Sequence, residues 1–147
     1  MSTIRITKEF RYEGAHALLG YDGKCQYIHG HSYILYVTVK GSPINDPENC
    51  KNGMIMDFSV LKTIVNETVV DKFDLASVLR TDAPLASEIC SEYKNVVLVD
   101  FQPTCENLIS YFAGAIQARL PENVSLYSLR LHETASSYVE WFASDNV

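Results

Sequence analysis

The sequence predicts an α+β fold in which two helices cover one face of an antiparallel sheet. Long stretches near both ends of the chain alternate apolar and polar residues, which is typical of half-buried strands. Two segments between these stretches repeat apolar residues at helical spacing. The predicted elements therefore follow the order β-β-α-α-β-β, with small extra strands, in a single domain over residues 1–147.

The first two strands are predicted to form a long antiparallel hairpin. Between residues 3 and 18 the apolar residues take even positions, and His16 falls on their face. Residues 19–24 include two glycines and an aspartate, so we interpret them as a turn. The second strand is predicted over about residues 29–40.

The middle of the chain is predicted to hold a loop and the first helix. Residues 41–53 are rich in proline, glycine and asparagine, which favours a loop, and a short strand is expected at 54–56. Asp57 is placed to cap a helix over residues 58–72, because a side-chain oxygen at that position can accept from the first free N–H groups.

The following segment is predicted to be less regular. Residues 80–95 are interpreted as irregular or as a short helix around 85–92, and residues 96–99 as a brief buried strand. Thr104 is the expected cap of a second helix, which Pro121 ends.

Two strands are predicted to complete the sheet. The fourth covers residues 137–143, and the third carries four residues on one face: Tyr127, Leu129, Leu131 and Glu133. An unpaired carboxylate at the end of an apolar face is costly, so Glu133 is expected to have a partner. That partner is either an N–H/NH₂ edge of a bound heterocycle or, alternatively, the side chain of Arg130 or Arg119, unless the strand end is simply solvated.

The composition excludes several classes of protein. The formal charge is −6 with no cluster of lysine and arginine, which argues against a nucleic-acid surface. No apolar run approaches the roughly 20 residues that cross a bilayer. The four cysteines form no C-x-x-C pair, so reduced thiols are expected, and we predict a cytoplasmic protein without membrane contact.

Three of the four histidines are expected to meet at one end of the hairpin. The strand period of two places His29 and His31 on one face, and an antiparallel neighbour can bring His16 opposite them. Three imidazoles with a free fourth position are typical of catalytic zinc, although each histidine could also be a core or turn residue. Cys25 is compatible with a fourth ligand, an inert buried thiol or a reactive nucleophile or base.

These motifs together resemble the family of 6-pyruvoyl-tetrahydropterin synthase and 6-carboxytetrahydropterin synthase. The matching segments span about residues 4 to 142 and are Gly14-Ala15-His16, Cys25-x3-His29-Gly30-His31, Gly53-Met54-Ile55-Met56-Asp57-Phe58, Pro103-Thr104-Cys105-Glu106-Asn107 and Glu133-Thr134. The three residues between Cys25 and His29 resemble the bacterial 6-carboxytetrahydropterin synthase branch, which serves queuosine and 7-deazapurine synthesis.

The resemblance implies a tunnelling fold and rings of subunits stacked into a hexamer. It implies Zn²⁺ on His16, His29 and His31, with Cys25 as a proton-transfer residue outside the metal shell. It also implies that Glu133 anchors a pterin ring near Thr104 and Glu106. The implied reaction converts 7,8-dihydroneopterin triphosphate to 6-carboxy-5,6,7,8-tetrahydropterin with loss of acetaldehyde and triphosphate.

One position departs from the family pattern. The family typically has an Asp-His pair after the first helix, which completes a proton relay with the cysteine, and the residues here are Asp74 and Leu75. Leucine carries no proton, so we expect slower turnover even if Asp74 keeps its catalytic role. His132 is not expected to substitute, since strand parity turns it away from Glu133. The alternatives are a non-catalytic pterin- or purine-binding relative and a 6-pyruvoyl-forming enzyme.

Overall fold

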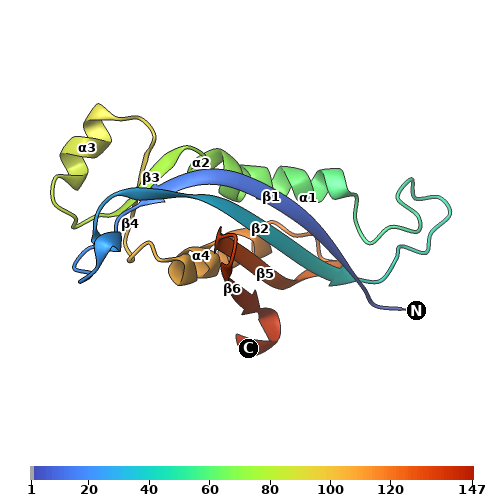
Figure 1. Cartoon of the computed structure of the whole chain (residues 1–147). Coiled ribbons are helices and arrows are strands. Elements are labelled where there is room, and N and C mark those ends of the chain that lie inside the picture. The colour runs from blue at the N-terminus through green and yellow to red at the C-terminus, as the bar shows by residue number, and fades with distance from the viewer. Residues whose placement is uncertain (1) are drawn as a thin grey trace.

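The structure, a computed structural model, describes residues 2–147 and consists of one curved sheet with helices (Figure 1). The strands are β1 Ile4–His16, β2 His29–Gly41, β3 Ala76–Arg80, β4 Val96–Val99, β5 Val124–Thr134 and β6 Ser137–Phe142. They lie in the order β4-β3-β1-β2-β5-β6. Pairing is antiparallel among β1, β2, β5 and β6, whereas β3 pairs in parallel with both β1 and β4. The α+β class is confirmed, and the sheet is mixed where a wholly antiparallel one was predicted.

The hairpin of β1 and β2 is the longest feature of the molecule. The two strands pair over their whole length, from Ile4 opposite Gly41 to His16 opposite His29. Figure 1 shows them as one curved ribbon, with the connecting loop at one end and the N-terminus at the other. Because successive side chains alternate between faces, one face of the hairpin carries its apolar residues and, at the loop end, its histidines.

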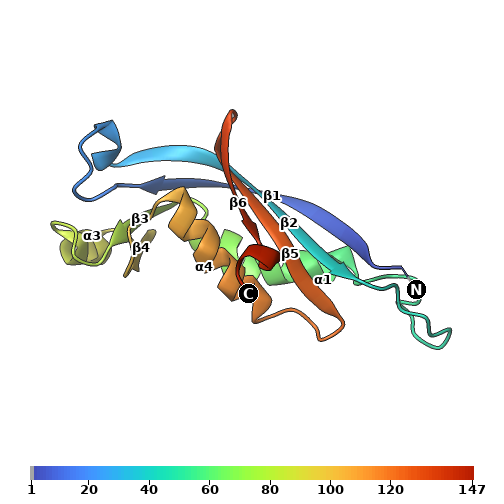
Figure 2. The same ribbon diagram turned by 90° about the horizontal axis from the view of Figure 1, so that it is seen from below.

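Two helical segments cover this apolar face, as predicted. The first comprises α1 Phe58–Val65, a π-helical turn η2 Asn66–Val70 and α2 Asp71–Phe73, and the second is α4 Cys105–Gln117. In Figure 2 α1 and α4 lie on the same side of the hairpin. Their buried residues join those of the strands in one hydrophobic core that includes Phe10, Leu35, Leu61, Phe112 and Leu129.

Both predicted helix caps are present. The Asp57 carboxylate accepts a hydrogen bond from Ser59 N at 2.8 Å, and the Thr104 hydroxyl accepts one from Asn107 N at 3.2 Å. Each satisfies an N–H group that has no partner within its helix. The cap at Thr104 also fixes where the chain enters α4, beside the histidines.

The predicted short strand at 54–56 does not form. Ile55 and Met56 are buried, which explains the apolar signal, but the backbone groups of this segment bond outside any sheet. Met54 O accepts from Ile44 N at 2.9 Å, and Ile55 O accepts from the side chain of Asn123 at 3.1 Å. The apolar triplet is therefore an irregular segment that packs on the core.

The segment that extends the sheet beside β1, residues 76–99, was only partly predicted. Strand β4 matches the expected strand at 96–99, and α3 Ala86–Glu92 matches the alternative of a short helix. Strand β3 was not predicted, because its five residues give little periodic signal and its pairing with β1 is a long-range contact.

The prediction that Tyr127 shares a strand face with Leu129 and Leu131 is wrong. The register between β2 and β5 shifts at this residue, which leaves it in a β-bulge. The ring of Tyr127 lies 3.9 Å below the guanidinium carbon of Arg5, and Leu126 is buried in its place. Beyond the bulge the predicted inward positions, Leu129 and Leu131, are correct.

No helix within residues 2–147 is both long enough and apolar enough to span a bilayer.

Candidate metal centre and binding cavity

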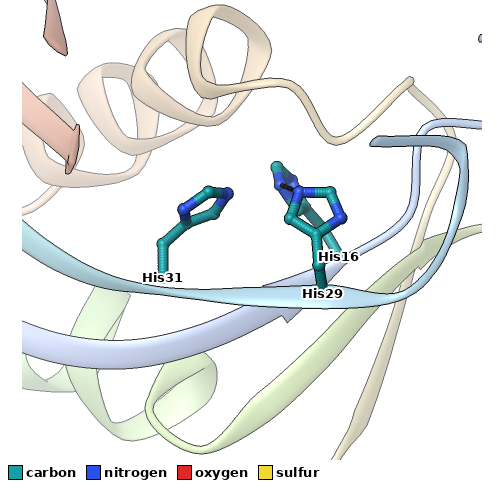
Figure 3. A group of neighbouring side chains, drawn as sticks. All are labelled: His16, His29 and His31. Carbon is teal, nitrogen blue, oxygen red and sulfur yellow. Dashed lines mark hydrogen bonds between the residues drawn. The ribbon is translucent and has the colours of Figure 1, made fainter. Parts of the chain in front are cut away.

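Three histidines converge at the closed end of the hairpin. His16 is the last residue of β1 and pairs directly with His29, the first residue of β2, and His31 follows on the same face. Figure 3 shows the three imidazoles pointing toward one another. Their ligand nitrogens all lie within 4.8 Å of one another. Nitrogens bound tetrahedrally to one zinc ion lie roughly 3.3 Å apart, so the cluster is close to a metal-binding geometry.

Backbone carbonyls fix the orientation of two of the rings. His16 Nδ1 lies 2.6 Å from Pro103 O, and His29 Nδ1 lies 2.7 Å from Tyr27 O. A carbonyl oxygen only accepts, so each Nδ1 carries the hydrogen and each neutral ring keeps a lone pair on Nε2. The two Nε2 atoms are 3.0 Å apart. Two lone pairs at that distance need a cation between them, either a proton or a metal ion.

Burial favours the neutral form of two of the imidazoles, those of His16 and His31. The side chain of His16 is almost fully buried, and this burial lowers its pKa. Burial also lowers the pKa of His31, against the opposing charge of Glu133. Nε2 of His31 is buried and has no hydrogen-bond partner among residues 2–147. Neutral nitrogens with outward carbonyl contacts are the donor set of a zinc site, so the residues fit the metal that the sequence predicted.

The cluster leaves one tetrahedral position without a protein ligand. Within residues 2–147 these three histidines form the one group of side chains close enough to share an ion, and Cys25 lies outside it. Among the alternatives for Cys25, the structure therefore gives no support to a fourth ligand. Three protein ligands and an open position are characteristic of catalytic zinc.

A cavity of about 510 Å³ adjoins the cluster. Its walls come from the loop after β1, the start of α4 and the end of β5, and the residues that line it include His16, Cys25, Thr104, Cys105, Glu106 and Glu133. The structure thus brings together most of the residues that the sequence singled out. Cys25 lies on a short turn, η1 Lys24–Gln26, and is partly exposed. This volume suits a small organic ligand.

Two residues of this cavity were not predicted. Gln102 holds the loop, because its side-chain amide accepts from Leu19 N at 3.1 Å and donates to Leu19 O at 2.8 Å. Cys105, which had no role assigned from the sequence, also lines the cavity, and burial raises the pKa of its thiol to about 12. A single glutamine before Pro103 gives no sequence signal of such a contact.

Glu133 lies beside the histidines without an arginine partner. Its Oε1 is 3.1 Å from His31 Nε2, although the angle is not that of a hydrogen bond. Arg130 pairs with Glu140 at 3.2 Å and Arg119 with Glu67 at 2.6 Å. The salt bridges considered for Glu133 are therefore absent from the described residues, and its carboxylate faces the cavity.

Asp74 does not line the cavity that holds Cys25. The Asp74 carboxylate accepts from Glu13 N at 2.9 Å and is not among the residues that line the cavity. Leu75 donates its N–H to Glu13 O at 2.6 Å, has a φ of +59° and is 68% exposed. His132 lies between the rings of Tyr36 and Tyr138, with centroids at 5.9 Å and 4.7 Å, and does not reach Glu133's cavity.

Curated relatives and solved structures resemble this chain over nearly its whole length. The 6-carboxy-5,6,7,8-tetrahydropterin synthase of Haemophilus influenzae is 33% identical over 142 residues, which cover 94% of this chain and 98% of that one. The 6-pyruvoyl tetrahydrobiopterin synthase of Dictyostelium discoideum is 33% identical over 117 residues, or 80% of this chain and 72% of that one.

Solved structures share the fold. A 6-pyruvoyl tetrahydropterin synthase from Caenorhabditis elegans superposes with a TM-score of 0.71 at 21% identity, covering 97% of each chain. An uncharacterised protein from Wolinella succinogenes gives a TM-score of 0.75 at 20% identity, covering 97% of this chain and 99% of that one. The predicted tunnelling fold is thereby confirmed.

The family model described as 6-pyruvoyl tetrahydropterin synthase matches residues 5–143. This range includes the three histidines, the cavity and both long helices. The chain therefore belongs to the 6-pyruvoyl tetrahydropterin synthase family.

Proposed function

We propose that this protein is a zinc-dependent 6-carboxytetrahydropterin synthase. It would convert 7,8-dihydroneopterin triphosphate to 6-carboxy-5,6,7,8-tetrahydropterin with release of acetaldehyde and triphosphate, in queuosine synthesis. Relatives that carry the name of this synthase match 92–94% of the chain, which supports a pterin-synthase function and a lyase-type reaction. The short spacing from Cys25 to His29 supports the carboxy-forming branch.

The observation that carries the proposal is the convergence of three kinds of group on one cavity. The histidines supply neutral nitrogens, Glu133 supplies a carboxylate without an arginine partner, and Cys25 supplies a partly exposed thiol. These groups suit three separate roles, which are holding a metal, binding the ring and transferring a proton. A site that served only to hold a structural metal would need the histidines alone.

The residues of the chain divide the chemistry among them. Zinc on His16, His29 and His31 would supply Lewis-acid polarisation of side-chain oxygens of the substrate. Glu133 would accept two hydrogen bonds from the amino and N–H edge of the pterin, as a carboxylate does from a guanidinium. Thr104 and Glu106 would line the ring's pocket, and Cys25 would move protons at the substrate side chain.

The position of Asp74 favours a site shared between copies of the chain. Asp74 is bonded to Glu13 N and does not line the cavity that holds Cys25, so a carboxylate that serves this cysteine would come from a second copy. Exposed apolar side chains at this end of the molecule support such a contact, among them Leu75 at 68%, Tyr27 at 64% and Ile28 at 59%. We propose a homo-oligomer, with a hexamer as the expected size.

Leu75 favours one rival function. A residue without a titratable group at the relay position is what a non-catalytic pterin- or purine-binding protein would tolerate. Such a protein would keep the metal and Glu133 but release no product. A 6-pyruvoyl-forming reaction on the same residues would differ only in the product.

Product analysis separates these functions. The zinc-loaded protein is incubated with 7,8-dihydroneopterin triphosphate, and the products are identified by mass spectrometry. The proposal expects 6-carboxy-5,6,7,8-tetrahydropterin together with triphosphate, and a 6-pyruvoyl product would assign the other branch. Tight pterin binding that Glu133→Ala abolishes, with no product from either the native protein or Leu75→His, would replace the synthase by the binding protein.

A further inference from the structure

Three buried polar side-chain atoms within residues 2–147 have no hydrogen-bond partner: Tyr12 Oη, Tyr33 Oη and His31 Nε2. They are neighbours, because the ring centroids of Tyr12 and Tyr33 are 4.8 Å apart and those of Tyr33 and His31 are 5.6 Å apart. Buried hydroxyls are almost always paired, since leaving one unpaired is costly. A metal ion would complete His31, but the two hydroxyls still need a partner.

The sheet places that partner beside them. Tyr12 and Tyr33 are direct partners on β1 and β2, and their rings stack with an interplanar angle of 9°. On the other side of β2, the ladder with β5 pairs Ile34 with His132. The next residue of β2 is Tyr33, which is buried, and the next residue of β5 is Glu133, which lies at a β-bulge against β6 and lines the cavity. Tyr12 and Tyr33 are therefore cross-strand neighbours, and Glu133 directly follows the residue of β5 that pairs with the neighbour of Tyr33 on β2.

The two rings also lean toward the metal centre. A Cβ atom at Gly14 would lie 3.1 Å from Cε2 of Tyr33 and 3.2 Å from Cε2 of Tyr12. Gly14 pairs with His31, so the rings extend over the residue opposite a metal ligand. The charge of Glu133 adds to burial in raising the pKa of the Tyr33 hydroxyl, as expected for a carboxylate close by.

The carboxylate of Glu133 lies close enough to the proposed metal centre to become a ligand unless another group holds it. Its Oε1 lies 3.1 Å from His31 Nε2, which is within reach of a metal bound there. Carboxylates readily bind zinc, and a fourth protein ligand would close the site. Within residues 2–147 no arginine forms an ion pair with this carboxylate, and both Arg130 and Arg119 pair with other glutamates.

We propose that Tyr33, supported by Tyr12, is a positioning residue that holds Glu133 out of the metal shell. When a cation takes Nε2 of His31, the Tyr33 hydroxyl donates to the Glu133 carboxylate, and the Tyr12 hydroxyl donates to the oxygen of Tyr33. This pairs both hydroxyls, keeps the fourth metal position open and leaves Glu133 free to accept from a ligand in the cavity. The inference rests on the proposed three-histidine metal centre.

Cobalt(II) tests this arrangement without reference to activity. Co²⁺ takes the same nitrogen and oxygen ligands as Zn²⁺, and its visible absorption changes when a carboxylate joins its ligands. Four forms of the protein are loaded with Co²⁺ and compared: the native chain, Tyr33→Phe, Glu133→Gln and the double variant. Tyr36→Phe is the matched control, because its hydroxyl donates to Glu9 at 3.0 Å on the opposite face of β2.

The proposal predicts a change in one form only. Native protein, Glu133→Gln and Tyr36→Phe should share one spectrum, because Glu133 is no ligand in any of them. Tyr33→Phe should shift it, because the released carboxylate binds the metal, and adding Glu133→Gln should restore the native spectrum. A Tyr33→Phe spectrum equal to the native one, or a shift that persists in the double variant, overturns the inference while the metal centre stands. Failure of the native protein to bind Co²⁺ overturns both.

Discussion

At the scale of single residues, the most consequential position is Leu75. Its backbone lies in the left-handed region at φ +59°, where a leucine is strained, and it is held there by hydrogen bonds. Its N–H donates to Glu13 O, and its carbonyl accepts from the Asn95 side chain at 2.6 Å. The chain thus fixes this side chain in an outward position, yet the side chain has no group that transfers protons.

Replacing Leu75 by histidine should therefore increase turnover. Histidine tolerates the left-handed region better than leucine, and general acid–base groups contribute about 10² to 10⁴ in rate. We expect kcat to rise by about tenfold or more in the standard turnover assay. Leu75→Asn is the matched control, because asparagine also tolerates this φ but has no titratable group. Equal rates for all three forms would rule out residue 75 as a relay position.

The buried histidines predict a pH dependence of stability. His16 has a lowered pKa in the folded chain, whereas its ordinary value is 6.5. Below pH 6.5 the unfolded chain therefore binds a proton that the folded chain does not. The free energy of unfolding consequently decreases as the pH is lowered. Urea unfolding of the metal-free protein at pH 7.5 and pH 5.5 measures this. In His16→Gln the difference in the free energy of unfolding between the two pH values should be smaller than in the native chain. An unchanged difference would contradict the lowered pKa of His16.

At the scale of elements, the start of α4 connects stability to the site. Pro103 O contacts His16, and the next residue, Thr104, caps the helix. Thr104→Ala should cost about 1 kcal/mol, which lowers the melting temperature by roughly 3 °C. Thr104→Ser keeps the hydroxyl and should melt like the native chain. Thermal unfolding followed by circular dichroism measures both, and an unchanged melting temperature for the alanine variant would argue against the cap.

Elements with a strong local period could be predicted from the sequence. The hairpin and the two long helices follow from the periodicity of their apolar residues, and the same period of two placed His29 and His31 on one face. Strand β3 and the bulge at Tyr127 depend on pairing with distant strands, which a local pattern does not contain. For the same reason, the separation of Asp74 from Cys25 could not be predicted.

At the scale of the whole molecule, that separation predicts a shared active site. Cys25→Ala and Asp74→Asn should each turn over more slowly than the native chain, because each removes one proton-transfer group from every site. In a mixed oligomer some sites receive a native Cys25 from one copy and a native Asp74 from another. Mixing the two variants under conditions of subunit exchange should therefore restore part of the turnover. A mixture no more active than its components would place the relay within one subunit or exclude it.

We propose that three histidines at the end of one hairpin hold the zinc on which a pterin synthase reaction depends. Turnover of 7,8-dihydroneopterin triphosphate by the same sample, measured before chelation, after chelation and after zinc is returned, tests it most directly. Chelation should remove both activity and about one zinc ion per chain, as expected for a single three-ligand site, and zinc should restore them. Full turnover by protein that elemental analysis shows to be free of metal would contradict the claim.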